Sequence, residues 1–137
     1  MAVYLSNGVV LTVNAVDLSS LVSSVTINRS FDELEVTAMG DSGHKFVKGL
    51  EASSITIDFF NDEATNKTLQ TLNSSSVWGN SVTVTVKQTS AATSASNPLY
   101  TMSCLVNNIT PVNGAVADLS TQSVTWNVNG TIAITTS

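Results

Sequence analysis

Apolar and polar residues alternate along most of the chain. In residues 21–29, Val25 and Ile27 share one face. Thr26 and Asn28 share the other face. A period of two is typical of a β-strand with one buried side. The same pattern predicts strands in five further segments: residues 33–36, 53–60, 81–87, 99–106 and 124–128.

The period changes in the middle of the chain. Residues 61–63 are Asn-Asp-Glu, a capping residue followed by two acidic residues that favour the first turn of a helix. Leu69 and Leu72 follow at helical spacing. We expect one helix over residues 62–73, which is too short to be stable unless it packs on a sheet. Since strands and helices do not alternate, the predicted fold class is mainly β: an antiparallel β-sandwich or barrel with one flanking α-helix, in a single domain over residues 1–137.

Two segments depart from the strand pattern. Residues 1–20 contain Ser6-Asn7-Gly8 between two apolar runs, which is consistent with either a hairpin or a flexible arm. Residues 88–98 read QTSAATSASNP and lie between two expected strands. A loop this long is uncommon unless it is functional or disordered. We therefore predict a flexible loop that orders on contact with a neighbour.

The last strand is less clearly specified. Asn129-Gly130 is a strong signal for a tight hairpin turn. Ile132 and Ile134 would then return as an edge strand. A bulge at Asn129-Gly130, followed by a loose tail, is the alternative.

The composition narrows the classes of function. Charged residues make up 11% of the chain, against about 25% in a typical globular protein. The surface must then consist of hydroxyl and amide groups, and copies of the chain repel one another weakly, which favours self-assembly. The net charge of −5 argues against attraction to nucleic acid phosphates.

Neither disulfide chemistry nor a membrane anchor is indicated. Cys104 is the single cysteine, so an internal disulfide is excluded, and we expect its thiol in the core. No window approaches the roughly 18 apolar residues of a membrane helix. The first residues lack the basic region of a signal peptide. We expect a protein made in a cytoplasm and not inserted into a membrane.

Candidate catalytic residues are few. One polar, glycine-containing loop holds Asp41, Ser42 and the only histidine, His44. In a serine triad the base must lie between acid and nucleophile, which three residues of one short loop can rarely achieve. Glu33 and Glu35 share a strand face without a pocket that would separate their pKa values. One histidine with scattered carboxylates has no recognised metal-ligand spacing. We expect no catalytic, metal-binding or cofactor-binding residues, and hence no enzyme.

Several short segments follow one another in a characteristic order. They are TAMGDS at residues 37–42, FVKGLE at 46–51, SITI at 54–57, the helix start at 61–62, ITP at 109–111, VAD at 116–118 and SVTW at 123–126. In this order they resemble the major tail tube proteins of long-tailed (siphovirus-type) phages, which are related to the tube proteins of type VI secretion systems. The resemblance covers most of the chain beyond Leu21. It implies a β-sandwich or barrel with one helix, which forms hexameric rings that stack into a hollow tube for genome passage.

A stack of rings requires two unlike contact surfaces on each subunit. Sheet edges could join neighbours within a ring by strand addition, and polar loops are expected between rings. The expected contact residues are Thr37, Gly40, Asp41, Ser42, His44, Gln88, Thr89, Ser90, Thr93 and Ser94. Hydroxyl and amide groups with a modest negative potential would let DNA slide. The expected lumen-facing residues are Ser54, Thr56, Asp58, Ser123, Thr125 and Asn127.

The predicted function is that of a structural virion protein, located in the tail and assembled in the host cytoplasm. Expected partners are other copies of the chain, the tail initiator or tape measure protein and the tail terminator, with DNA passing without tight binding. Two alternatives stay open. The chain could be the tube protein of a contractile tail or secretion system. It could instead be a β-sandwich adhesin or binding module, but this would call for an exposed aromatic or metal-lined pocket. Trp78 and Trp126 are expected to pack in a turn and in the core.

Overall fold

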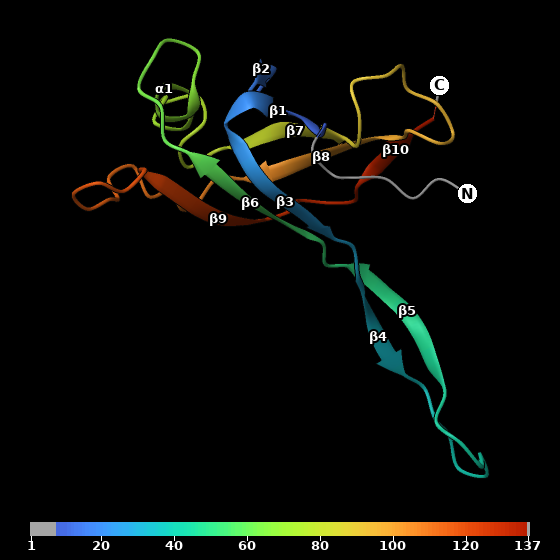
Figure 1. The fold of residues 1–137 in the computed structure, drawn as a ribbon. Coiled ribbons are helices and arrows are strands. Elements are labelled where there is room, and N and C mark those ends of the chain that lie inside the picture. Colours follow the sequence, from blue (N-terminus) through green and yellow to red (C-terminus); the bar gives the residue numbers. More distant parts are fainter. Residues whose placement is uncertain (1–7, 137) are drawn as a thin grey trace.

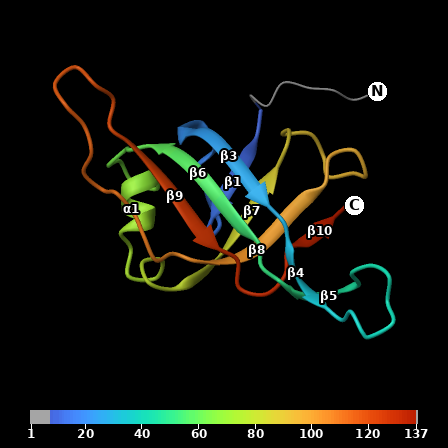
Figure 2. The same cartoon turned by 90° about the horizontal axis from the view of Figure 1, so that it is seen from below.

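The computed structural model describes residues 8–136 (Figure 1). Its strands form three antiparallel sheets: five strands in the order β10-β8-β7-β1-β2, three in the order β3-β6-β9, and the pair β4-β5. The two larger sheets face each other, and the β4-β5 pair projects away from them (Figures 1 and 2). The predicted antiparallel fold with one flanking helix is confirmed. The strand bounds are β1 Val10–Val13, β2 Val16–Asp17, β3 Val22–Asn28, β4 Phe31–Glu35, β5 Phe46–Glu51, β6 Ser54–Phe60, β7 Ser81–Lys87, β8 Leu99–Leu105, β9 Thr121–Asn127 and β10 Ala133–Thr135.

The core lies between the two larger sheets, as the alternation of apolar residues predicts. From the three-stranded sheet, β6 and β9 contribute fully buried Ile55, Ile57 and Trp126. From the five-stranded sheet, β7 contributes buried Val84 and β8 contributes Cys104. Burial raises the pKa of the Cys104 thiol to about 12, so the thiol stays protonated and unreactive.

The helix is shorter than predicted. Instead of residues 62–73, α1 spans Thr68–Leu72. Asn66 adopts a left-handed backbone conformation with φ of 61°, and Lys67 is extended. The side chain of Thr68 donates a hydrogen bond of 2.9 Å to the Phe60 carbonyl. This tertiary contact ties the start of the helix to the end of β6. A second short helical element, η1, spans Ser19–Leu21. No helix among the described residues is long and apolar enough to cross a membrane.

The N-terminal segment is only partly described. Residues 1–7, with most of the predicted Ser6-Asn7-Gly8 turn, lie outside the described residues. Residues 10–17 are not an arm, because β1 pairs with β7 and buries Leu11 and Val13. The turn that joins β1 to β2 is Asn14-Ala15, with φ of 52° and 66°, values that suit a two-residue hairpin.

The Asn129-Gly130 turn does not join two paired strands, so the hairpin prediction is wrong. Val128 N donates to the carbonyl of Ser53, just before β6 of one sheet, and Asn129 N donates to the carbonyl of Ser103 in β8 of the other. The chain therefore crosses between sheets here. The predicted edge strand forms as β10, but it pairs with β8.

Side chains cover the outer edge of β9. Asn108 and Asn113 donate hydrogen bonds of 3.0 and 2.8 Å to carbonyl oxygens of β9. The Gln122 side chain, 3% exposed, accepts from Thr110 N at 3.0 Å and donates to Asn61 Oδ1 at 2.8 Å. These contacts fasten the loop that precedes β9 to the sheet.

Replacing Gln122 with Ala is expected to lower the free energy of unfolding by about 1–3 kcal/mol, because Thr110 N–H and Asn61 Oδ1 lose their partner. Denaturant unfolding measures the change. The matched control is Ser123→Ala at an exposed position of the same strand, where a change within about 0.5 kcal/mol is expected. Equal stabilities of the two variants would contradict the role of Gln122.

Candidate subunit-contact surface

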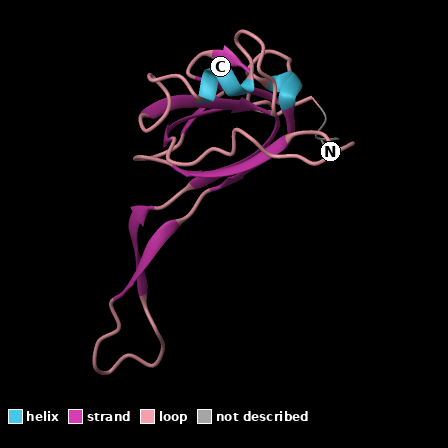
Figure 3. Ribbon diagram, turned by 90° about the vertical axis from the view of Figure 1, so that its left-hand side faces the viewer, coloured by secondary structure: helices cyan, strands magenta, loops and turns pink. Residues whose placement is uncertain are grey.

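The β4-β5 hairpin is the most unusual feature of the molecule (Figures 1 and 3). It extends away from the two packed sheets, and all five residues of β4 are exposed. Leu34 lies directly opposite Val47, and Glu35 lies opposite Phe46. The register shifts near Gly49, where a Cβ atom would lie 2.8 Å from the Asp32 carbonyl oxygen. Only glycine fits such a close approach.

Apolar side chains occupy both faces of this hairpin. Leu34 and Val47 share one face and are 53% and 47% exposed. Phe31 and Phe46 are exposed to a similar extent, and the Lys48 ammonium lies 5.5 Å from the Phe31 ring centroid. We call the Leu34/Val47 side the apolar face, and it includes exposed Val36, two residues beyond Leu34. Contiguous exposed apolar residues of this kind mark interaction surfaces.

The first predicted contact loop forms the tip of this hairpin. Thr37, Gly40, Ser42 and His44 are exposed, and Asp41 is half-buried. Asp41 Oδ2 accepts from Ala38 N at 2.7 Å, and Asp41 Oδ1 pairs with Lys45 Nζ at 3.0 Å. The tip is therefore an ordered turn with side chains available to a neighbour.

The His44 side chain pairs with Glu35 of β4. His44 Nδ1 contacts Glu35 Oε2 at 2.6 Å, and Thr37 Oγ1 donates to the same oxygen at 2.8 Å. Hydrogen bonds from His44 and then Thr37 hold the pKa of Glu35 below its usual value. The backbone of Ala38 and then Lys45 lower the pKa of Asp41 in the same way. Both carboxylates thus serve to hold the loop closed.

The second predicted contact loop lies elsewhere on the molecule. Gln88, Thr89, Ser90, Thr93 and Ser94 belong to the loop between β7 and β8, well away from the hairpin tip (Figure 1). Buried Asn97 organises this loop. Its Nδ2 donates to the carbonyls of Thr89 and Ala91 at 3.3 and 3.0 Å. Flexibility of residues 88–98 stays a prediction.

The predicted lumen-facing residues all lie on one sheet face. Ser54, Thr56 and Asp58 point outward from β6, and Ser123, Thr125 and Asn127 point outward from β9, because their neighbours in each strand are buried. Thr56 and Thr125 share a hydrogen bond of 3.1 Å. The register adds three residues that sequence reasoning did not include: Ser24, Thr26 and Asn28 of β3. Asp58 is the only ionisable group in this nine-residue set, which we call the polar face.

Glu51 ties the base of the hairpin to the body. Its Oε2 accepts from Ser53 Oγ at 2.8 Å and from the Ile132 amide at 3.0 Å. Hydrogen bonds from Ser53 and then Ile132 lower the pKa of Glu51 below its usual value. Since Ile132 lies just before β10, the hairpin is anchored to the C-terminal segment.

This anchor is expected to weaken in acid. A carboxyl with a lowered pKa contributes stability above its unfolded-state pKa, and that contribution is lost as pH falls through the folded-state pKa. Glu51→Gln keeps both acceptor contacts without the charge, so its stability should fall less than that of the native chain as the solution becomes more acidic than a free glutamate's pKa. Thermal unfolding over a pH series measures the difference. If the melting temperatures of the two proteins change with pH in the same way, Glu51 does not stabilise the hairpin base through its charge.

The fold is shared with a solved structure over nearly the whole chain. The match is to a chain in "Cryo-EM Structure of an Extracellular Contractile Injection System, PVC sheath/tube terminator in extended state", with a TM-score of 0.70 and 16% sequence identity. It covers 98% of this chain and 97% of that chain. No protein-family model matches the chain, and no curated protein matches it closely enough to count as a relative. At this identity the likeness establishes the fold alone.

Proposed function

We propose that the chain is a structural subunit that assembles into the stacked rings of a tail tube, and that the projecting β4-β5 hairpin makes a contact between subunits. The observation that carries the proposal is the apolar face of the hairpin, which solvent contacts in the isolated subunit. A small domain gains nothing from extending half-exposed Leu34 and Val47 into water. The contact becomes favourable when a neighbouring copy covers these side chains.

The geometry of the hairpin fits a heterologous contact. A hairpin that extends from one end of a subunit meets a different surface on the next copy, so the contact can repeat without closing on itself. Repetition of this contact produces a stack. The polar tip around Asp41 and His44 supplies hydrogen-bonding groups at the rim of such a contact.

The polar face supports a role as the wall of a channel. Its hydroxyl and amide groups, with Asp58 as the one ionisable residue, offer DNA phosphates no cation to bind. A polyanion can then pass without being held. The partners proposed with this role are other copies of the chain, an initiator or tape measure protein, a terminator and transiting DNA.

The kind of tail is also part of the proposal. The sequence resemblance favours the major tail tube of long-tailed phages, whereas the shared fold favours the tube of a contractile tail or injection system. The name of that solved structure includes a sheath/tube terminator, which makes a terminator the second candidate. In each case the protein would belong to the tail of an assembled particle, and we propose that it has no catalytic activity.

Electron microscopy of the purified chain at increasing concentration tests the proposal. A tube subunit should form rings and then tubes with an open channel, alone or when seeded with a tail initiator. Single rings that never elongate would favour the terminator. A monomer under all of these conditions would overturn both candidates.

A further inference from the structure

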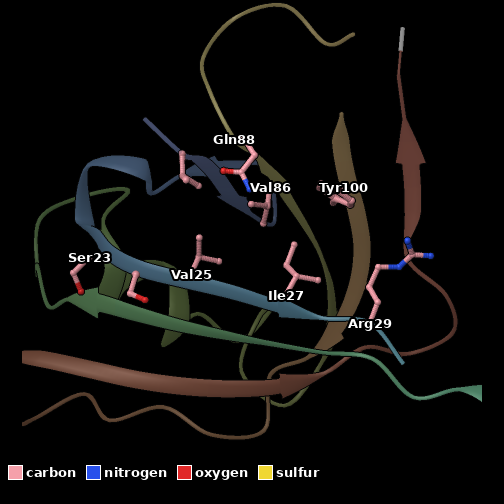
Figure 4. A pocket seen from close by; sticks show the side chains of 9 residues that line it. Ser23, Val25, Ile27, Arg29, Val86, Gln88 and Tyr100 are labelled. Atoms are coloured by element: carbon pink, nitrogen blue, oxygen red, sulfur yellow. The ribbon is translucent and has the colours of Figure 1, made fainter. Parts of the chain in front are cut away.

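A groove of about 480 Å³ lies between the two large sheets (Figure 4). One wall is β3, from which Val25 and Ile27 point into the space between the sheets. The other wall includes Val86 of β7, Gln88 just beyond it, and Tyr100 of β8. Val9, which precedes β1, also lines the groove.

The apolar layer of the core is incomplete at this groove. Val25 pairs with Ile57 and Ile27 pairs with Ile55 across the sheet. Ile57 and Ile55 are 0% exposed, while Val25 and Ile27 are only half-buried. Both pairs point toward the core, so the difference lies in what covers them. Beneath β6 the opposite sheet completes the packing, and beneath β3 the groove leaves it open.

The groove also holds a polar group that needs a donor. The side-chain oxygen of Gln88 is buried and has no hydrogen-bond partner among the residues that the structure describes. A carboxamide oxygen accepts hydrogen bonds and cannot donate them. Whatever fills the groove should therefore present an N–H or O–H group beside apolar side chains, as a polypeptide segment does.

The described chain begins at this groove. Residues 1–7 precede Gly8, and Val9 is already part of the lining. Seven extended residues span at most about 25 Å, which matches the length of the seven-residue strand β3, roughly 23 Å. The segment reads MAVYLSN, and in an extended conformation Val3 and Leu5 fall on the same side.

We propose that residues 1–7 of the same chain occupy the groove, with Val3 and Leu5 against Val25 and Ile27 and a donor from the segment on Gln88 Oε1. The N-terminal segment thereby completes the core of its own subunit. This goes beyond the proposed role in assembly, because the contact forms within one chain. Attachment at Val9 keeps the segment at high effective concentration near the groove.

Disulfide trapping tests the proposal in the full-length chain at low concentration. Leu5→Cys combined with Ile27→Cys should form an intramolecular disulfide under mild oxidation. The matched control is Leu5→Cys with Thr26→Cys, because Thr26 lies on the opposite face of β3. We expect the first pair to cross-link at least about tenfold faster, since only its thiols can meet within disulfide geometry. Cys104 does not interfere, because it is fully buried.

Either of two results overturns the proposal: equal rates for the two pairs, or disulfides that form only between chains. A second measurement does not depend on the exact register. Deleting residues 2–7 should lower the melting temperature and speed amide hydrogen exchange in β3, while exchange in the β4-β5 hairpin stays unchanged. A deletion that leaves both the melting temperature and the exchange of β3 unaltered also overturns it.

Discussion

Replacing Leu34 and Val47 together with aspartate is expected to abolish tube assembly while leaving the melting temperature of the subunit nearly unchanged. The two residues are directly opposed on the hairpin and about half exposed, so the isolated subunit loses little packing. In an assembled tube, covering the exposed half of each side chain would contribute about 1 kcal/mol, roughly half the value for full burial. A carboxylate buried in its place without a partner would cost several kcal/mol more. Because every contact in the stack repeats this loss, no tube should form.

Sedimentation and electron microscopy measure assembly, and thermal unfolding measures the subunit. Thr83→Asp with Ser103→Asp is the matched control, because these residues form a directly opposed pair on the outer face of the five-stranded sheet. The control variant should still form tubes. If the Leu34/Val47 variant forms tubes, or if both variants lose assembly equally, the hairpin does not make the assembly contact.

If the polar face lines a channel, as proposed, placing lysines on it is expected to make that channel retain DNA. Thr56→Lys with Thr125→Lys puts two cations on neighbouring strands, where the native side chains share a hydrogen bond. Each lysine that contacts a phosphate increases the affinity for DNA. In a plot of the logarithm of the binding constant against the logarithm of salt concentration, each such contact makes the slope more negative by about 0.9 for duplex DNA. With many subunits around one channel, we expect binding at low salt to rise by orders of magnitude.

Binding of a short fluorescent DNA to preformed tubes measures this effect over a salt series. Thr83→Lys with Ser103→Lys adds the same charge to the outer face of the other sheet. If the polar face lines the channel, DNA bound to the Thr56/Thr125 variant should resist nuclease, and DNA bound to the control should be digested. Equal nuclease sensitivity would assign the polar face to the outside of the tube.

Alternation of residue type was sufficient to predict the packed sheets. Ile55 and Trp126 face the core, and Thr56 and Thr125 face outward, as a period of two requires. The predicted helix is longer than α1 because the start of α1 depends on a contact outside the local sequence. The Thr68 side chain bonds to the Phe60 carbonyl, and no propensity rule contains that information.

For the hairpin, the sequence pattern predicts the local structure but not its environment. Alternation in residues 33–36 divides carboxylates from apolar side chains, but it does not say whether anything covers the apolar side. Coverage of Leu34 depends on where the hairpin lies relative to the sheets. The sequence does carry one sign that this hairpin is exposed: charged Glu33, Glu35 and Lys48 lie next to its apolar residues. The tip residues Asp41 and His44 could be proposed as contacts from the sequence, whereas Leu34 and Val47 could not.

The loop before β9, which is held to that strand by side-chain hydrogen bonds, also affects the tendency of the protein to aggregate. An open strand edge on a weakly charged β-protein is a template for amyloid-like fibres. Asn108 and Asn113 occupy carbonyl oxygens along β9 that a foreign strand would otherwise bind. With these acceptors occupied, we expect less irreversible aggregation along this edge, which would leave subunits available for the proposed assembly.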